Sequence, residues 1–240
     1  MRFRHPGTVP DLDGETYFDT LEHLHKTLQP KTYLEIGTLT GRSLQISTCD
    51  SIAIDPDFCL EAEYLSKIMA KPSLHFFRMT SDDFFNSYSP LDIFGQPIEF
   101  AFLDGMHLCE FLLRDFMNTE KHCSHSATIV LHDCLPVEEG MAERDGPQSS
   151  RSAPHRQGWW TGDVWRTALL LKRRRPDLRI RAFDAYATGL ILIDQLDPSN
   201  KYLFDNYDVL AAEMLTWSYT EIGIEGLINE LEVRSTATLY

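Results

Sequence analysis

Residues 33–43, with the sequence YLEIGTLTGRS, constrain the fold of this chain more than any other stretch. The apolar start suits a short strand inside a sheet, and Gly37 lets the backbone turn sharply where a side chain would clash. Gly41 would keep the next turn bare at the start of a helix, where main-chain N–H groups can bind a ligand. This order of strand, glycine turn and helix predicts an α/β fold with a ligand site at the carboxyl ends of its strands.

Two acidic residues accompany the glycine turn. Glu35 is expected to face the ligand crevice, where a carboxylate repels a pyrophosphate and suits a ligand with positive charge. Asp55 follows the glycines by about 20 residues, at the end of a second predicted strand, 51–55. An acid in that place commonly accepts hydrogen bonds from the ribose of a nicotinamide or methyl-donor cofactor. The alternative for Asp55 is a structural role in opening the turn 55–57.

Two nearly continuous apolar runs, 98–103 and 127–131, predict strands that are buried on both faces. The first run ends at Asp104 and the second ends at His132 and Asp133. If these strands are neighbours at the centre of the sheet, they deliver both aspartates to the same edge, beside the cofactor.

The pattern Glu35-x-Gly37-x-x-x-Gly41 resembles the cofactor loop of class I S-adenosylmethionine-dependent methyltransferases. Residues 102–107 and 130–133 resemble a branch of small, often metal-dependent O-methyltransferases related to macrocin O-methyltransferase and the cephalosporin-biosynthesis enzymes. The resemblance extends over residues 30–195. It implies a Rossmann-like, doubly wound, mostly parallel seven-stranded sheet with an antiparallel edge hairpin and helices on both faces.

The resemblance also implies S-adenosylmethionine as the cofactor. Residues after the third predicted strand, 74–78, would approach the adenine, although capping of the next helix by Ser81 or Asp82 is an alternative. The expected cofactor-binding residues are Glu35, Gly37, Thr38, Gly41, Ser43, Asp55, Ser81, Asp82 and Asp104.

Methyl transfer from a sulfonium is an in-line displacement, so it needs an aligned and activated acceptor oxygen. Asp104, His132 and Asp133 are the expected ligands of a divalent metal, Mg²⁺ or Mn²⁺. Related enzymes often carry a third carboxylate or an Asn beside the second Asp, where this chain has His132 and Cys134, so a metal-free enzyme is the alternative. Catalysis is assigned to Asp104 and to His107, the expected general base because its near-neutral pKa suits that role. A purely structural His107 is the alternative.

Residues 135–161 show no apolar period, which indicates a lid, a binding loop or a disordered insert. Aromatic and polar residues at its end would stack on a sugar or planar acceptor and fix its polar groups, with ordinary lid and helix packing as the alternative. These expected substrate residues are Trp159, Trp160, Asp163, Trp165 and Arg166.

The remaining segments divide the chain into an N-terminal arm and cap helix (1–29), a cofactor domain (30–195) and a C-terminal helical extension (196–240). The arm is expected at 1–14 and the amphipathic helix at 16–28, with His23 and His25 on its surface. Further helices are expected at 43–48, 58–69, 108–120 and from 162 to 175, and two in 200–231. A loop is expected at 89–97, a closing hairpin at 180–183 and 188–193, and an arm or oligomer contact at 236–240.

The composition limits the partners. A net charge of −14 over 240 residues argues against a general binder of nucleic acid or acidic membranes. Five scattered cysteines indicate reduced thiols, and neither a secretory signal nor about 18 consecutive apolar residues occur, so a cytoplasmic protein is expected. The apolar tail favours a homodimer.

Three classes of function stay open. The favoured one is methyl transfer to a hydroxyl of a small molecule, such as a sugar or a natural-product intermediate. A nicotinamide-dependent oxidoreductase would normally show Gly-x-Gly-x-x-Gly, and the spacing from Gly37 to Gly41 differs. A non-catalytic binding or scaffold protein with the same fold is the third.

Overall fold

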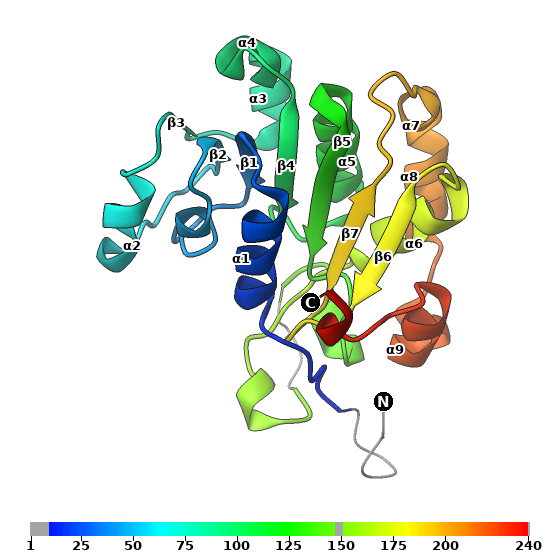
Figure 1. The fold of residues 1–240 in the computed structure, drawn as a ribbon. Helices are drawn as coiled ribbons and strands as arrows, with labels where there is room; N and C mark the ends of the chain where they lie inside the picture. The colour runs from blue at the N-terminus through cyan, green and yellow to red at the C-terminus, as the bar shows by residue number, and fades with distance from the viewer. Residues whose placement is uncertain (1–9, 147–150, 240) are drawn as a thin grey trace.

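The computed structural model describes residues 10–146 and 151–239, and a seven-stranded sheet lies at its centre (Figure 1). The strand order is β3-β2-β1-β4-β5-β7-β6. β1 to β5 run parallel, and β7 is antiparallel to both β5 and β6. The predicted sheet and its antiparallel hairpin are therefore confirmed. The strands are β1 (Thr32–Ile36), β2 (Asp50–Ile54), β3 (Leu74–Phe77), β4 (Ile98–Leu103), β5 (Cys123–His132), β6 (Arg179–Phe183) and β7 (Leu190–Asp194).

Helices cover both faces of the sheet, because successive strand residues point to opposite faces and both sets are apolar. Tyr33 and Phe100 pack in one core with α1 and α2, whereas Leu34 and Ala101 belong to the core beneath α3, α5 and α6. The helices are α1 (Tyr17–Leu28), α2 (Ala62–Ile68), α3 (Ser81–Ser87), α4 (Pro90–Phe94), α5 (Cys109–His122), α6 (Trp165–Arg174), α7 (Tyr202–Asp205), α8 (Tyr207–Leu215) and α9 (Tyr219–Glu230).

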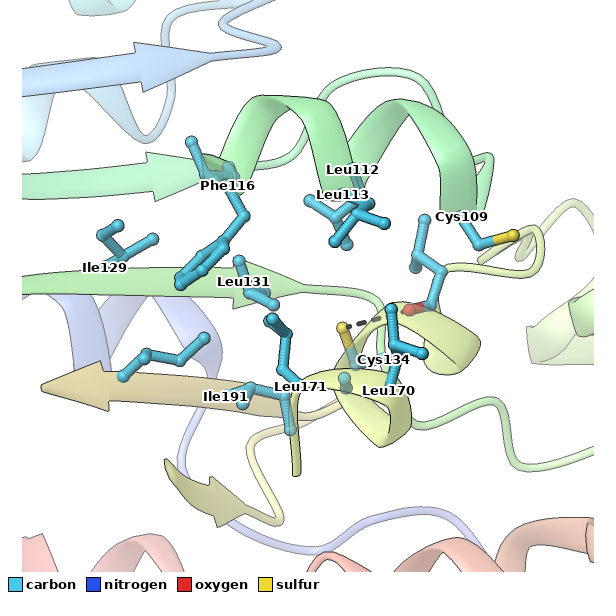
Figure 2. Close-up of a cluster of buried hydrophobic side chains, with 14 of the residues drawn as sticks. Cys109, Leu112, Leu113, Phe116, Ile129, Leu131, Cys134, Leu170, Leu171 and Ile191 are labelled. Atoms are coloured by element: carbon cyan, nitrogen blue, oxygen red, sulfur yellow. Dashed lines mark hydrogen bonds between the residues drawn. The ribbon is translucent and has the colours of Figure 1, made fainter. Parts of the chain in front are cut away.

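The larger core fixes the carboxyl ends of the central strands. Phe116 of α5, Leu131 of β5 and Leu171 of α6 are fully buried and meet between the sheet and the two helices (Figure 2). The thiol of Cys134 also donates to the carbonyl of Val164, 3.9 Å away, so the segment after β5 is tied to the start of α6.

Several expected elements differ from the structure. The helix expected at 43–48 is only a 3₁₀ turn, Leu44–Ile46, because β2 begins at Asp50 and leaves too few residues for an α-helix. The helix expected at 58–69 begins at Ala62, and the expected loop at 89–97 contains α4. The N-cap of α3 is Thr80, whose hydroxyl accepts from the backbone N–H of Asp83, rather than Ser81 or Asp82.

Residues near the two ends of the described chain, Glu15 and Thr236, meet near the start of α1. Thr16 caps α1, and the backbone N–H of Glu15 donates to the hydroxyl of Thr236 at 2.8 Å. The expected arm at 1–14 lies partly outside the described residues, and 236–239 form a 3₁₀ turn whose Thr236 is buried. The tail contains three helices instead of two. None of the helices in the described ranges is long and apolar enough to cross a membrane.

The expectation that His25 lies on the surface is wrong. Its ring packs edge-on against Tyr33 and Phe100, with centroids 4.8 and 4.7 Å away. Burial, helped by the positive charge of Lys71, lowers the pKa of His25 to about 3. His25 is therefore a half-buried, neutral residue whose ring packs against the core beneath α1.

Candidate functional site

A cavity of about 830 Å³ lies at the carboxyl ends of β1, β2, β4 and β5, within the size range of small-molecule sites. It is closed on one side by the first turn of α1, through Tyr17 and Phe18. Of the residues predicted from the sequence to form a site, those that line the cavity are Gly37, Thr38, Ser43, Asp55, Ser81, Asp82, Asp104, His107, His132 and Asp133.

Gly37 holds the loop after β1 tightly against the end of β4. Its φ is +86°, and a Cβ at this position would lie 1.9 Å from the carbonyl oxygen of Asp104. Gly41 has a different role from the one expected. A Cβ there would lie 2.6 Å from Cδ1 of Ile68, and Gly41 is not among the cavity-lining residues, so its small size serves packing against α2.

Asp55 stands at the end of β2 and faces the cavity. Its Oδ2 accepts from the N–H of Leu39 at 2.8 Å and its Oδ1 accepts from the N–H of Asp57 at 2.7 Å. The carboxylate thus opens the turn, as the structural alternative predicted. Each oxygen has a further lone pair for a ribose hydroxyl, so the two roles are compatible.

Glu35 does not face the cavity, contrary to expectation. It is fully buried, where it accepts from the hydroxyl of Tyr33 at 2.5 Å and from that of Ser43 at 3.0 Å. Burial raises the pKa of Glu35 to about 7, in spite of these hydroxyl donors. Glu35 therefore positions the wall of the site through Ser43 and has no direct path to a ligand.

At the far end of the cavity, Ser81 and Asp82 begin α3 behind the end of β3. Asp82 is held from α5 by the guanidinium of Arg114, at 2.7 Å. Its orientation at the wall is therefore fixed before any ligand binds.

Two aspartates and two histidines meet at the ends of β4 and β5. Nδ1 of His132 lies 3.0 Å from Oδ1 of Asp104, and Nε2 of His107 lies 3.2 Å from Oδ2 of Asp133. Asp133 has a φ of 58°, which is uncommon outside glycine, and its other oxygen accepts from the hydroxyl of Thr188. The prediction that both strands deliver their acids to one edge is confirmed.

The potential metal ligands in this cluster differ from the predicted set. Single donor atoms of Asp104, His107 and Asp133 lie within 4.8 Å of one another. His107 thus takes the place expected for His132, which lies under the ring of Tyr17 with centroids 4.1 Å apart. Two carboxylates and one imidazole suit Mn²⁺ better than Mg²⁺, which prefers oxygen donors throughout.

The same cluster has strongly shifted protonation equilibria. Burial opposes charge on His107, but the carboxylates of Asp133 and Asp104 outweigh it and raise the pKa of His107 to about 9. Burial likewise favours a neutral Asp104, but the charge of His132 dominates and holds the pKa of Asp104 well below its usual range. His107 is consequently a proton donor at neutral pH, which corrects its expected role as a general base in this arrangement.

None of the five expected substrate residues lines the cavity. Trp165 is 1% exposed and packs against Tyr219, while Asp163 accepts from the N–H of Cys109 at 2.8 Å and from Arg166 at 2.5 Å. These three expected substrate residues therefore hold α6 in place.

Of the other two expected substrate tryptophans, Trp160 contacts a residue of the site. The carbonyl oxygen of Trp160 lies 3.0 Å from Nδ1 of His107, and its ring lies beside that imidazole, with centroids 4.9 Å apart. Trp159 packs edge-on against Tyr186. Trp160 thus positions a cluster residue, which is a different role from stacking on an acceptor.

The segment expected to be a structureless insert at 135–161 is packed over its described parts. Val137 and Met141 are fully buried, and short 3₁₀ turns occur at Glu139–Ala142 and Pro154–Arg156. Residues 147–150 lie outside the described part of the chain.

Sequence reasoning missed the contribution of α1 and of Arg42. The segment 16–28 was expected only as an amphipathic helix, yet its Tyr17 covers His132. The guanidinium carbon of Arg42 lies 4.0 Å from the centroid of Phe18. No local motif signals these contacts, because they depend on how α1 docks.

Known structures share this architecture. No protein-family model matches the sequence, and no curated protein matches it significantly. Cofactor-bound Rv0187 from MTB aligns with a TM-score of 0.53 and 16% identity, over 76% of this chain and 80% of that chain. The SAH-bound methyltransferase PaMTH1 from Podospora anserina gives 0.52 and 11%, over 75% and 78%. Likeness at such low identity concerns the fold alone, and the chain has the Rossmann-like fold of class I methyltransferases.

Proposed function

We propose that the protein is an S-adenosylmethionine-dependent methyltransferase that methylates a hydroxyl group of a small molecule, such as a sugar or a natural-product intermediate. The observation that carries this proposal is a single cavity in which Asp55 stands at the end of β2 and the Asp104–Asp133 cluster stands at the ends of β4 and β5. We therefore infer that a nucleoside-binding site and an acid–base site lie in the same cavity, which is large enough for a small-molecule ligand.

The cofactor's place follows from the walls. Its ribose would bind Asp55, its adenine would lie toward Ser81 and Asp82, and its sulfonium would point to Asp104. Carboxylates along this path favour a cation over a pyrophosphate. The two similar structures, one cofactor-bound and one SAH-bound, support this choice.

The reaction is a displacement at the methyl carbon. The acceptor oxygen attacks that carbon, the carbon–sulfur bond breaks, and its electron pair stays on sulfur to give S-adenosylhomocysteine. The hydroxyl proton must leave the acceptor. We assign the carboxylate of Asp133 as the acceptor of this proton. Thr188 and His107 hold that carboxylate in position, and His107 stabilises its negative charge as a hydrogen-bond donor.

A divalent metal fits the same cluster. Asp104, Asp133 and His107 would hold it through two carboxylates and one imidazole. When bound, it would lower the pKa of the acceptor hydroxyl. Without it, His107 and His132 balance the two carboxylates, so the chain can carry out the proton transfer by either route.

The test is a calorimetric titration of S-adenosylhomocysteine into the protein, with NAD in a parallel titration and with each repeated in Mg²⁺, Mn²⁺ and EDTA. We expect micromolar binding of S-adenosylhomocysteine and no binding of NAD. Binding of NAD alone would favour the oxidoreductase. Binding of neither would leave a non-catalytic protein with this fold.

A further inference from the structure

Arg42 directly follows the glycine loop and lines the cavity beside the first turn of α1. Its guanidinium carbon stands 4.0 Å from the centroid of the Phe18 ring. A guanidinium that stacks on an aromatic ring keeps the N–H groups at its own edge free. These N–H groups can therefore still bind an anion. The stacking therefore fixes the position of a cation at the cavity wall without satisfying its charge.

Arg42 has no carboxylate partner in the described part of the chain, where no Asp or Glu oxygen lies within 4.0 Å of its guanidinium. The arginines near the same edge of the sheet are paired, Arg78 with Asp57 and Arg114 with Asp82. Arg42 is also the one lysine or arginine among the described residues that line the cavity. In a protein of net charge −14, an unpaired cation at this wall indicates an anionic group on the ligand.

The methyl donor has one anionic group, the carboxylate at the end opposite its adenine. With the adenosine at Asp55 and the sulfonium at Asp104, this end of the cofactor must extend along the loop that carries Arg42. The neighbouring hydroxyl of Ser43 is not available as a donor, because it donates to Glu35 at 3.0 Å. We propose that Arg42, stacked on Phe18, binds the amino-acid carboxylate of the cofactor, an inference that rests on the proposed function.

Two ligands that differ only in this carboxylate test the proposal. They are S-adenosylhomocysteine and its decarboxylated analogue, 5′-(3-aminopropylthio)-5′-deoxyadenosine, each titrated into wild type, Arg42→Gln and Arg78→Gln. Arg78→Gln is the matched control, because it removes one positive charge near the same edge from a residue that does not line the cavity. Thermal unfolding of each variant establishes that it is folded.

We expect Arg42→Gln to weaken binding of S-adenosylhomocysteine by about 10- to 100-fold, the range of a charge-assisted hydrogen bond, and to leave the analogue unaffected. Arg78→Gln should change neither affinity. Equal binding of S-adenosylhomocysteine by wild type and Arg42→Gln would overturn the assignment and favour an anionic group of the acceptor as the partner of Arg42. An equal loss of affinity for both ligands would overturn it as well. If wild type bound neither ligand, the proposed function would fail first and this inference with it.

Discussion

Nδ1 of His132 lies 3.0 Å from Oδ1 of Asp104, so a residue at the end of β5 pairs with one at the end of β4. The second pair crosses in the opposite direction, because His107 follows β4 and contacts Asp133 after β5. These crossed pairs bring two carboxylates together within the cavity and compensate their charge. The relationship explains how a buried acid, Asp133, and a half-buried one, Asp104, are tolerated side by side.

Replacing either carboxylate by its amide should stop methyl transfer and spare cofactor binding. Asp104→Asn and Asp133→Asn keep the shape of the side chain but remove the charge and the proton acceptor. We expect turnover to fall by about 100-fold or more, the scale of lost acid–base catalysis, while affinity for S-adenosylhomocysteine changes little. Transfer of a labelled methyl group to an acceptor that wild type methylates measures turnover, and calorimetry measures the affinity for S-adenosylhomocysteine. A fully active Asp104→Asn would refute the assignment.

The half-buried His25 should make stability depend on pH in the acid range. The imidazole of His25 takes up a proton near pH 6.5 in the unfolded chain but only near pH 3 in the folded chain. Its contribution to the free energy of unfolding is therefore fully present above pH 6.5 and is lost as the pH falls toward 3. Between pH 7 and pH 5 this loss is about 2 kcal/mol. Urea unfolding at pH 7 and pH 5 should show a smaller loss of stability for His25→Phe than for wild type. The control His125→Gln, at an exposed site, should lose as much stability as wild type. Identical pH profiles for wild type and His25→Phe would contradict the account.

Alanine variants of two glycines with positive φ, Gly95 and Gly37, distinguish the stability cost of backbone strain from the cost of a steric clash. Gly95→Ala places an alanine at a φ of +68° with nothing within 4 Å and should cost about 1–2 kcal/mol of stability. Gly37→Ala adds a Cβ 1.9 Å from the Asp104 carbonyl oxygen, so about 1–3 kcal/mol more should be lost, together with ligand binding. Urea midpoints and titration of S-adenosylhomocysteine measure both effects. Similar midpoints for the two variants would mean that the loop is not packed against β4 as described.

Asp163 tests a residue whose role the structure reassigns from substrate binding to packing. Its carboxylate is 1% exposed and pairs with Arg144 and Arg166. Asp163→Ala leaves the largely buried Arg166 without its carboxylate partner and the N–H of Cys109 without its acceptor, whereas Arg144 keeps Glu110. We expect a loss of about 3–5 kcal/mol in the free energy of unfolding, measured in urea. Glu230→Ala, which removes an exposed partner of Arg173, is the control and should cost less than about 1 kcal/mol. A stable Asp163→Ala that only raised KM would restore the substrate role.

The sheet was predictable because its evidence is local. The apolar runs before Asp104 and Asp133 are long enough to name buried strands, and parallel strands bring their ends to one edge. The orientation of Glu35 was also available in principle. It alternates with Leu34 and therefore shares a face with Tyr33, whose hydroxyl reaches it at 2.5 Å. The functional expectation for an acid at a strand end took precedence over that simple alternation.

Other parts of the site depend on contacts that no local pattern encodes. Asp163 meets Cys109 across 54 residues of sequence, and Phe18 meets Arg42 only after α1 has docked on the sheet. The pKa of His107 likewise follows from the partners that folding gives it, Asp133 above all. The type of residue indicated chemistry at this edge, but its assignment among base, donor and ligand required the tertiary structure.

Calorimetric titration of S-adenosylhomocysteine into wild type, Asp55→Ala and Asp57→Ala tests most directly whether the cofactor binds in this cavity. Asp57 is the matched control, since it is close in sequence, faces Arg78 and does not line the cavity. We expect micromolar binding by wild type and Asp57→Ala, and binding weaker by about 1–3 kcal/mol in a folded Asp55→Ala. Equal affinities for wild type and Asp55→Ala would place the cofactor outside this cavity and contradict the account.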